Sequence, residues 1–302
     1  MPGVREKVDP TLLVVGAASR DIDPADPRGW RLGGTVNYAS LACARLGLRV
    51  RALIGVDETA AAAAELETLR SAGVEVELVA LRRGPVFENV ETPTGRLQYC
   101  FGRSDRLAAA TLPPAWREPA AVIFGPVAGE LDAEWATALP ATTLVGLTWQ
   151  GLLRRLRVGR PVEATRLRRT RLVARADLLA VSSDDARAGG APLKRLLRPR
   201  QELIVTGGAR GTLHLRRVAA GVAGWRVPAL PARTVVDPTG AGDVLLAAWL
   251  AARLCAPAAA GWRQLALAAA AASLSVEGVG LAGVAPLGAV GDLLRSGGAP
   301  GG

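Results

Sequence analysis

The 302-residue sequence contains one histidine, three cysteines and two lysines, and each scarcity excludes a class of function. Cys43, Cys100 and Cys255 lie far apart and form no CxxC pair, so with His214 as the only histidine no zinc-type cluster can be assembled. We expect each cysteine to be a small buried apolar residue in a reducing cytoplasm. His214 lies in a strand-like alternation without a nucleophile motif beside it, which favours a structural role over a catalytic triad.

Long apolar runs are also missing. The two most apolar stretches, Val244–Ala252 and Leu265–Val276, are too short to cross a membrane and are interpreted as buried helices. The first ten residues carry acidic side chains and a proline, and they lack the apolar centre of a secretory signal. We therefore expect a cytoplasmic protein without a membrane partner.

Lysine is nearly absent although the chain is basic, with a formal net charge of +10. Such a charge invites a nucleic-acid interpretation. The bias toward arginine, alanine, glycine and proline is, however, typical of GC-rich coding, so no specific nucleic acid is expected. Nine arginines lie between Arg154 and Arg175. We interpret this stretch as a solvated helix face, with a phosphate-binding patch as the alternative.

Apolar runs of strand length alternate with helical patterns along most of the chain. This alternation predicts an α/β fold with a mostly parallel central sheet covered by helices. The expected strands are Thr11–Val15, Arg49–Ile54, Val74–Leu81, Ala121–Phe124, Thr143–Leu147, Leu178–Val181 and Glu202–Thr206. The expected helices are Asn37–Leu46, Ala60–Ala72, Ala133–Ala138, Gly242–Cys255 and Arg263–Leu274. Residues Pro85–Cys100 instead resemble a β-hairpin outside the main sheet.

A glycine-rich turn opens a long apolar helix at residues 237–243, which read DPTGAGD. The backbone N–H groups of Gly240, Ala241 and Gly242 would converge at the helix N-terminus, where partial positive charge favours an anion. Asp243 in the first turn would place a carboxylate beside that anion, where it could accept a proton from an attacking hydroxyl. An aspartate that only caps the helix is the structural alternative.

Two segments carry a resemblance to a known family. The segment VDPTGAGDVLLAAWL resembles the carboxyl-terminal signature of the ribokinase-like (PfkB) carbohydrate kinases. Residues Leu32–Ala39, which read LGGTVNYA, resemble the amino-terminal signature of the same family. The resemblance implies a single domain over residues 1–302, built as a ribokinase-like three-layer α/β/α sandwich. It also implies a small β lid, contributed by residues 20–33 and 85–102.

The resemblance further implies an ATP-dependent kinase that transfers the γ-phosphoryl group to a hydroxyl of a sugar or polyol. Asp243 would be the general base, and the backbone of Gly240, Ala241 and Gly242 would form the anion hole. The acceptor would contact Asp21, Gly33, Gly34 and Asn37. The nucleotide would contact Thr206, Gly208, Gly211, Asp237 and Thr239. Asp185 would hold Mg²⁺ through water, and a monovalent cation such as K⁺ and a homodimer are further candidates.

The sequence departs from the commoner family pattern near the acceptor. Gly34 and Asn37 are separated by two residues instead of three, and Thr35 stands where a lysine often follows the Gly-Gly pair. The variant GGTVNYA resembles a bacterial branch with some likeness to inositol kinases. A nucleoside kinase stays open because Trp30 and Tyr38 could face a base, and a catalytically silent regulatory homologue is a third reading. Arg103, just after the hairpin, could neutralise phosphate, although a plain surface arginine is the simpler interpretation.

Overall fold

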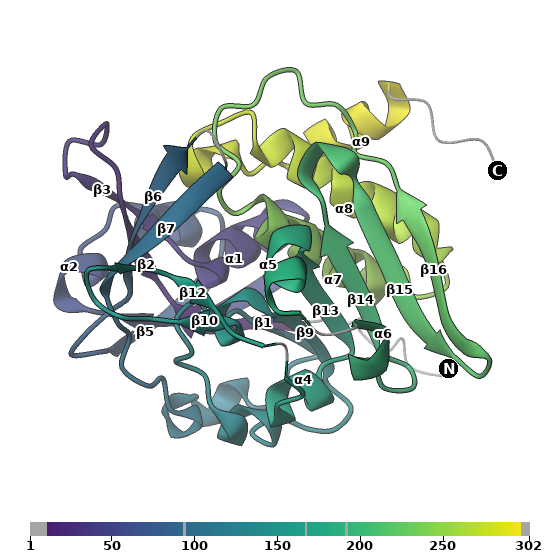
Figure 1. Ribbon diagram of the computed structural model, residues 1–302, viewed down its shortest axis with the longest axis horizontal. Helices are drawn as coiled ribbons and strands as arrows, with labels where there is room; N and C mark the ends of the chain where they lie inside the picture. Colours follow the sequence, from purple (N-terminus) through teal and green to yellow (C-terminus); the bar gives the residue numbers. More distant parts are fainter. Residues whose placement is uncertain (1–10, 93–94, 167, 191–192, 297–302) are drawn as a thin grey trace, which may run out of the picture.

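The computed structural model describes residues 11–92, 95–166, 168–190 and 193–296. A nine-stranded sheet with the order β16-β15-β14-β13-β9-β8-β1-β4-β5 crosses the molecule (Figure 1). The strands from β14 to β5 are parallel, and β15 and β16 add an antiparallel edge. The predicted α/β class with a mostly parallel sheet is confirmed. The strands are β1 (Thr11–Ala17), β4 (Arg49–Val56), β5 (Glu75–Ala80), β8 (Ala121–Phe124), β9 (Leu144–Thr148), β13 (Leu178–Ser182), β14 (Glu202–Thr206), β15 (Thr212–Val218) and β16 (Gly221–Val227).

Strand β1 is buried on both faces, as its unbroken apolar sequence predicts. Because successive side chains of a strand point to opposite faces, Leu12 and Val14 enter one hydrophobic core, and Leu13 and Val15 enter a second core. The first core contains α1 (Thr35–Arg45), α7 (Ala241–Cys255) and α8 (Gly261–Ser275). The second contains Trp135 and the short helix α4 (Arg171–Arg175). The sheet is therefore the middle of three layers.

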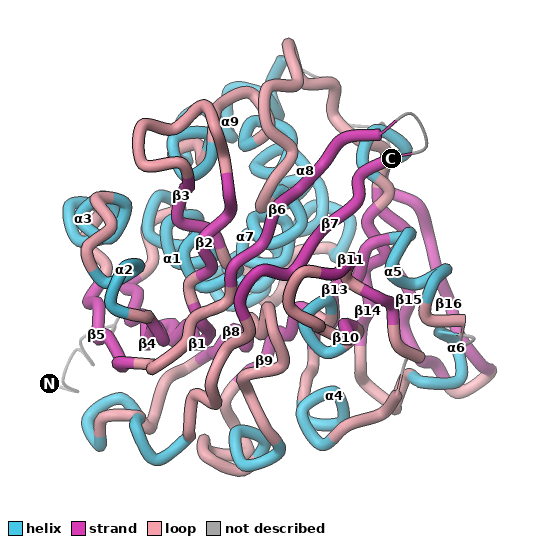
Figure 2. Tube along the Cα trace, turned by 60° about the vertical axis from the view of Figure 1, so that its left-hand side comes forward, coloured by secondary structure: helices cyan, strands magenta, loops and turns pink. Residues whose placement is uncertain are grey.

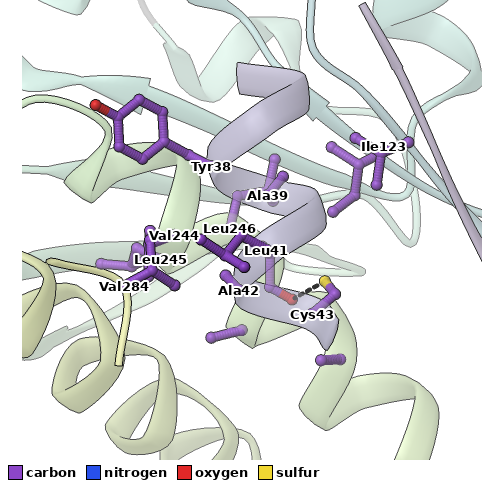
Figure 3. Packing of buried hydrophobic residues seen from close by; sticks show 14 of the residues in the cluster. Tyr38, Ala39, Leu41, Ala42, Cys43, Ile123, Val244, Leu245, Leu246 and Val284 are labelled. Carbon is purple, nitrogen blue, oxygen red and sulfur yellow. Dashed lines mark hydrogen bonds between the residues drawn. The ribbon is translucent and has the colours of Figure 1, made fainter. Parts of the chain in front are cut away.

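Helices α1 and α7 carry both predicted signatures and pack directly against each other. Their contact is made mostly by small and aliphatic side chains, which allow the two backbones to come close (Figure 3). The Cys43 thiol donates a hydrogen bond to the Ala247 carbonyl across this contact, at 3.7 Å. Two sequence segments about 200 residues apart are thus fixed side by side, with both helix N-termini near the same end of the parallel strands.

A second, five-stranded sheet has the order β11-β7-β6-β2-β3 (Figure 2). It consists of β2 (Ser19–Ile22), β3 (Trp30–Gly33), β6 (Val86–Thr92), β7 (Gly95–Gly102) and β11 (Arg160–Pro161). Strands β6 and β7 form the predicted antiparallel hairpin. The pairing of β11 with β7 brings in a third segment that the sequence did not indicate. We call these five strands the lid sheet.

Three predicted helices are wrong or shortened. Residues 60–72 contribute to two short helices, α2 (Glu58–Ala61) and α3 (Glu65–Ser71), in place of one long helix. The Asp57 side chain caps the start of α2 by accepting the Ala60 N–H. Residues 133–136 form only a 3₁₀ turn. The arginine-rich stretch holds β10 (Arg154–Arg155), β11, β12 (Glu163–Ala164) and α4, because Gly159 and Pro161 interrupt any helix there.

The remaining helices are α5 (Ser183–Ala188), α6 (Leu193–Leu196) and α9 (Leu287–Ser296). Among the residues that the structure describes, no helix is long and apolar enough to cross a membrane. The two most apolar stretches of the sequence lie instead within α7 and at the end of α8, where they pack against the sheet and against each other.

Candidate active site

Asp243 lies in the first turn of α7 and is held by the first turn of α1. The Thr35 hydroxyl donates a hydrogen bond to Asp243 Oδ1 at 2.7 Å. The Thr148 hydroxyl at the end of β9 lies 3.4 Å from the Thr35 hydroxyl, so strand and helices jointly orient the carboxylate. The surrounding protein desolvates the partly exposed Asp243 and raises its pKa to about 6. Such a group is ionised at neutral pH and can still take up a proton.

The turn before α7 is shaped for a close approach to its backbone. Gly240 has φ of 79°, which a residue with a Cβ rarely adopts, and a Cβ there would overlap the ring of Tyr38. A Cβ at Gly242 would meet nothing within 4 Å. In the described part of the chain, the N–H groups of Gly242 and Asp243 have no backbone or side-chain partner. The helix therefore begins with two N–H groups that remain available to an anion, as an anion hole requires. The Ala241 N–H, predicted as a further donor, instead donates to the Pro238 carbonyl at 3.4 Å.

Asp237 stabilises the conformation of the same turn through two hydrogen bonds. One carboxylate oxygen accepts the N–H of Thr239 at 2.9 Å, and the other accepts the N–H of Gly280 at 3.0 Å. Arg31 of the lid sheet lies 3.4 Å from that second oxygen. These hydrogen bonds hold the pKa of Asp237 below its usual range. Asp237 thus ties the 237–243 turn to the loop after α8 and to β3. Gly280 belongs to the GxGxxG-like segment at 278–283, which forms a loop and a 3₁₀ turn.

Asp21 on β2 lies within electrostatic range of Asp243, and its negative charge raises the pKa of Asp243. Burial is the main reason that the pKa of Asp21 rises to about 6, while a hydrogen bond of 2.9 Å from the Ser19 hydroxyl lowers it. A Cβ at Gly33 would overlap the Asp21 carboxylate. Gly34, with φ of 97°, forms the N-cap of α1. The glycine pair therefore lets β2 and α1 approach closely beside Asp21.

Asn37 is fully buried, which the sequence alone does not reveal. Its side-chain NH₂ donates to the Gly33 carbonyl at 2.7 Å, while its Oδ1 atom has no partner among the described residues. In this structure Asn37 fixes the backbone of the glycine pair. Its role as a direct acceptor ligand stays a prediction.

The predicted nucleotide residues gather at the ends of β13 and β14. Thr206 ends β14, and Gly208 and Gly211, with φ of 58° and 80°, form the turn that leads into β15. The Arg210 side chain reaches from this turn to the Ser183 hydroxyl at the start of α5, at 2.9 Å. The two ends are therefore linked across the adjacent strands.

Asp185 was the predicted metal residue. Its Oδ2 accepts a hydrogen bond from the Ser182 hydroxyl at 2.7 Å, and its backbone N–H donates to Ser182 Oγ at 3.0 Å, which makes Ser182 the N-cap of α5. The described residues contain no group of three or more His, Cys, Asp or Glu that could hold a metal. A single carboxylate does not fit direct protein coordination, but it fits Mg²⁺ that keeps its waters and binds mainly to phosphate.

Two site residues were missed by sequence reasoning. Thr35 was noted only as a missing lysine, yet its hydroxyl orients Asp243. Arg154 was counted within a solvated stretch, yet its guanidinium lies in range of Asp21, Asp185 and Asp243. Arg103 instead lines a cavity of about 320 Å³ at the root of the lid sheet, together with Arg20, Asp57, Arg82, Arg83 and Phe101.

Comparison with solved structures defines the class of the fold. A pyrophosphate-dependent kinase in the ribokinase family, complexed with a pyrophosphate analogue and myo-inositol, superposes with a TM-score of 0.74 at 18% identity, covering 94% of this chain and 99% of the other. The ribokinase of Arabidopsis thaliana, complexed with ribose and ATP, gives 0.67 at 19% identity, covering 95% and 99%. The nucleoside kinase of Methanocaldococcus jannaschii gives 0.66 at 17%, covering 95% and 98%. The chain therefore has the ribokinase-like fold.

The family comparison adds sequence information to that fold. Residues 170–286 match the pfkB family of carbohydrate kinases, and this region includes the 237–243 turn and α7. The predicted resemblance to the ribokinase-like (PfkB) carbohydrate kinases is thus confirmed. The chain has the fold and family signature of a phosphotransferase that acts on alcohol groups. No curated protein sequence matches it significantly.

Proposed function

We propose that this protein is an ATP-dependent kinase that phosphorylates a hydroxyl of a sugar or polyol, with Asp243 as the general base. The observation that carries the proposal is the meeting of Asp243 with the free N–H groups of its own helix N-terminus. A base and an anion hole at one place are what phosphoryl transfer to an alcohol requires. The match of residues 170–286 to the pfkB carbohydrate kinases supports the same chemistry.

In the proposed reaction, Asp21 and the Gly33–Gly34 backbone orient the acceptor so that one hydroxyl faces Asp243. Thr35 holds the Asp243 carboxylate toward that hydroxyl. Asp243 takes the proton as the acceptor oxygen attacks phosphorus, and the N–H groups of Gly242 and Asp243 stabilise the negative charge of the transferred group. Mg²⁺, held through water near Asp185, would neutralise charge on the donor phosphates.

The donor side rests on the turn at residues 206–211. There, Thr206, Gly208 and Gly211 would contact the nucleotide, while Thr239 and Asp237 keep the phosphate turn in shape. The ribokinase of Arabidopsis thaliana is named as a complex with ATP, which supports ATP as the donor. Two of the solved structures with the same fold are of pyrophosphate-dependent kinases, so pyrophosphate should be tested as an alternative donor.

A nucleoside acceptor receives less support from the structure. Tyr38 is only 4% exposed, and its ring packs against Gly240 instead of facing a substrate. Trp30 is partly buried, and the Arg28 guanidinium lies 4.6 Å from the centre of its ring. Neither aromatic side chain is therefore free to stack on a base in this structure. Sugars and polyols, which need hydrogen bonds more than a stacking surface, fit better.

The test is a phosphorylation screen of pentoses, hexoses, inositols and nucleosides with Mg-ATP and, separately, with Mg-pyrophosphate. Asp243→Asn is measured in parallel and is expected to lower turnover by about 10²–10⁴ while donor binding persists. Asp21→Ala is expected to weaken acceptor binding chiefly. If the wild-type protein binds the donor but phosphorylates no acceptor, the result would favour the hypothesis of a catalytically silent regulatory homologue. An Asp243→Asn variant with wild-type turnover would remove Asp243 as the base.

A further inference from the structure

Arg154 is a side chain whose position near the proposed site could not be predicted from the sequence. Its guanidinium interacts electrostatically with Asp185 on the donor side, with Asp21 on the acceptor side and with Asp243 between them. It comes from β10, in a segment that crosses from the core strand β9 to the lid strand β11. Phe87, whose ring the guanidinium contacts, pairs with Asp21 across strands β6 and β2, and this places Arg154 close to the acceptor side of the site.

The backbone around Arg154 is firmly built. Its neighbour Leu153 is 2% exposed and anchors the segment in the second hydrophobic core. Strand β10 pairs with β12, with Arg154 opposite Ala164. Arg155, the next residue, points to solvent with a side chain that is 61% exposed. Because neighbouring residues of a strand face opposite ways, this register turns Arg154 inward.

The guanidinium itself makes two contacts with the described residues. One of its nitrogens donates to the Val127 carbonyl at 3.2 Å, and its carbon lies 5.4 Å from the centre of the Phe87 ring on lid strand β6. No carboxylate in the described part of the chain is within ion-pair distance of it. An arginine carries five N–H donors, so most of its donors remain available. A partly buried cation with unused donors, facing carboxylates without contacting them, leaves room for an anion between them.

We propose that Arg154 donates hydrogen bonds to the phosphoryl group during its transfer and is therefore a catalytic residue. This inference rests on the proposed kinase function. In the step it serves, a bond forms between the acceptor oxygen and phosphorus, and the bond from phosphorus to the bridging oxygen of the donor breaks. The hydroxyl proton goes to Asp243, and the electron pair of the broken bond leaves with the donor product. Arg154 stabilises the negative charge on the oxygens of the phosphoryl group during its transfer.

The contact with Phe87 connects this role to the lid sheet. A cation over an aromatic face is attracted by it, and the attraction is stronger where water is excluded. When the lid sheet lies over the site, Phe87 fixes the guanidinium plane and desolvates it. The phosphoryl contacts of Arg154 are then made only in the closed enzyme.

The experiment compares Arg154→Gln, Arg154→Lys and the matched control Arg155→Gln, which removes the neighbouring exposed charge. Steady-state rates are measured with the donor and acceptor that the wild-type enzyme uses. Binding of ADP with and without aluminium fluoride, a mimic of the transferred group, is measured by calorimetry in the presence of Mg²⁺ and acceptor. If pyrophosphate is the donor, inorganic phosphate replaces ADP. Thermal melting checks that each variant is folded.

Arg154→Gln is expected to lower kcat by about 10²–10³ with both KM values within a few-fold, the cost of removing one oriented donor from an anion site. It should weaken the aluminium fluoride complex by a similar factor and leave ADP binding unchanged. Arg154→Lys keeps the positive charge on an aliphatic side chain but loses the planar fork of donors, so it should recover only part of the rate. Arg155→Gln should behave as wild type.

Four outcomes would overturn the proposal: kcat within about threefold of wild type in Arg154→Gln, a loss confined to acceptor KM, undiminished aluminium fluoride binding, or an equal loss in Arg155→Gln. These are distinct from failure of the proposed function. In that case the wild-type protein itself would phosphorylate nothing with either donor, and both assignments would fall together. A folded, active wild type with an unaffected Arg154→Gln variant overturns the role of Arg154 alone.

Discussion

At the scale of single residues, the site pairs two carboxylates whose pKa values both lie near 6, and this pairing predicts the pH dependence of catalysis. Asp243 must be ionised to accept a proton, so kcat/KM should fall about tenfold per pH unit below roughly pH 6. The negative charge of Asp21 raises the pKa of Asp243. Asp21→Asn should therefore shift the acidic limb of the profile to lower pH. An acidic limb that stays in place in this variant would show that Asp243 does not sense Asp21.

The raised pKa of Asp243 also predicts a gain in stability when its charge is removed. The ordinary pKa is 3.8, and the folded protein raises it to about 6. Ionisation therefore costs folding free energy that appears as the pH rises from about 4 to 6 and is fully present above it. Asp243→Asn keeps an acceptor for Thr35 and should be more stable by about 1–2 kcal/mol at pH 8, after allowance for the partial exposure of the side chain.

The measurement is thermal unfolding of both proteins between pH 3.5 and 8. Each kcal/mol corresponds to about 2–4 °C in Tm for a chain of this size. The difference in Tm should shrink toward zero as the pH falls to 3.5, where the carboxyl group is mostly protonated in both the folded and the unfolded state. A constant difference at every pH would point to packing instead of charge.

At the scale of elements, two glycines at the start of α7 have different roles. Substitution by alanine should therefore affect stability and donor binding differently at the two positions. At Gly240 the positive φ and the Tyr38 ring both oppose a Cβ, so Gly240→Ala should lose Tm as well as activity. At Gly242 a Cβ meets no atom within 4 Å, so Gly242→Ala should fold at least as stably. Its methyl group would nevertheless stand where the phosphate must approach.

Calorimetry measures the affinity of the two variants for the donor, and thermal melting measures their Tm. Together they distinguish a structural role from a role in phosphate binding. Gly242→Ala is expected to keep its Tm and to bind the donor at least tenfold more weakly, which corresponds to about 1.4 kcal/mol. Donor affinity equal to that of wild type in Gly242→Ala would mean that the phosphates do not lie at the N-terminus of α7.

The same turn shows what the sequence could predict and what it could not. The segment DPTGAGD could be predicted as a phosphate site because its glycines, the helix start and the carboxylate are adjacent in the sequence. Each of these features acts on its immediate neighbours. The contacts of Thr35 with Asp243 and of Arg154 with Val127 join residues 208 and 27 positions apart. Nothing local to Arg154 marks it among nine arginines, since only the register of β10 turns it inward. Asn37 could likewise be predicted as a site residue from the motif around it. Its burial could not, because it depends on how α1 packs in the hydrophobic core.

At the scale of the whole molecule, the residues of the proposed site come from two bodies of structure, the central layers and the lid sheet. Asp243, Thr35 and Thr148 belong to helices and a strand of the central layers, whereas Asp21 and Phe87 belong to the lid sheet. Arg154 lies on the segment that passes between them. Since neither body holds the full set, an acceptor and a donor bound together would contact both, and binding should draw the lid sheet onto the core.

This coupling predicts that the lid sheet becomes protected only when both substrates are present. Hydrogen exchange of β6 and β7 should slow in Asp243→Asn incubated with Mg²⁺, donor and acceptor, because this variant binds both and turns over slowly. Either substrate alone should protect these strands less, since each contacts only part of the combined site. The opposite edge strand β5, which pairs only with β4, contributes none of the predicted site residues and serves as an internal control. Equal exchange of β6 and β7 in all states would mean that the lid sheet is already closed in the free protein and that its position does not gate the reaction.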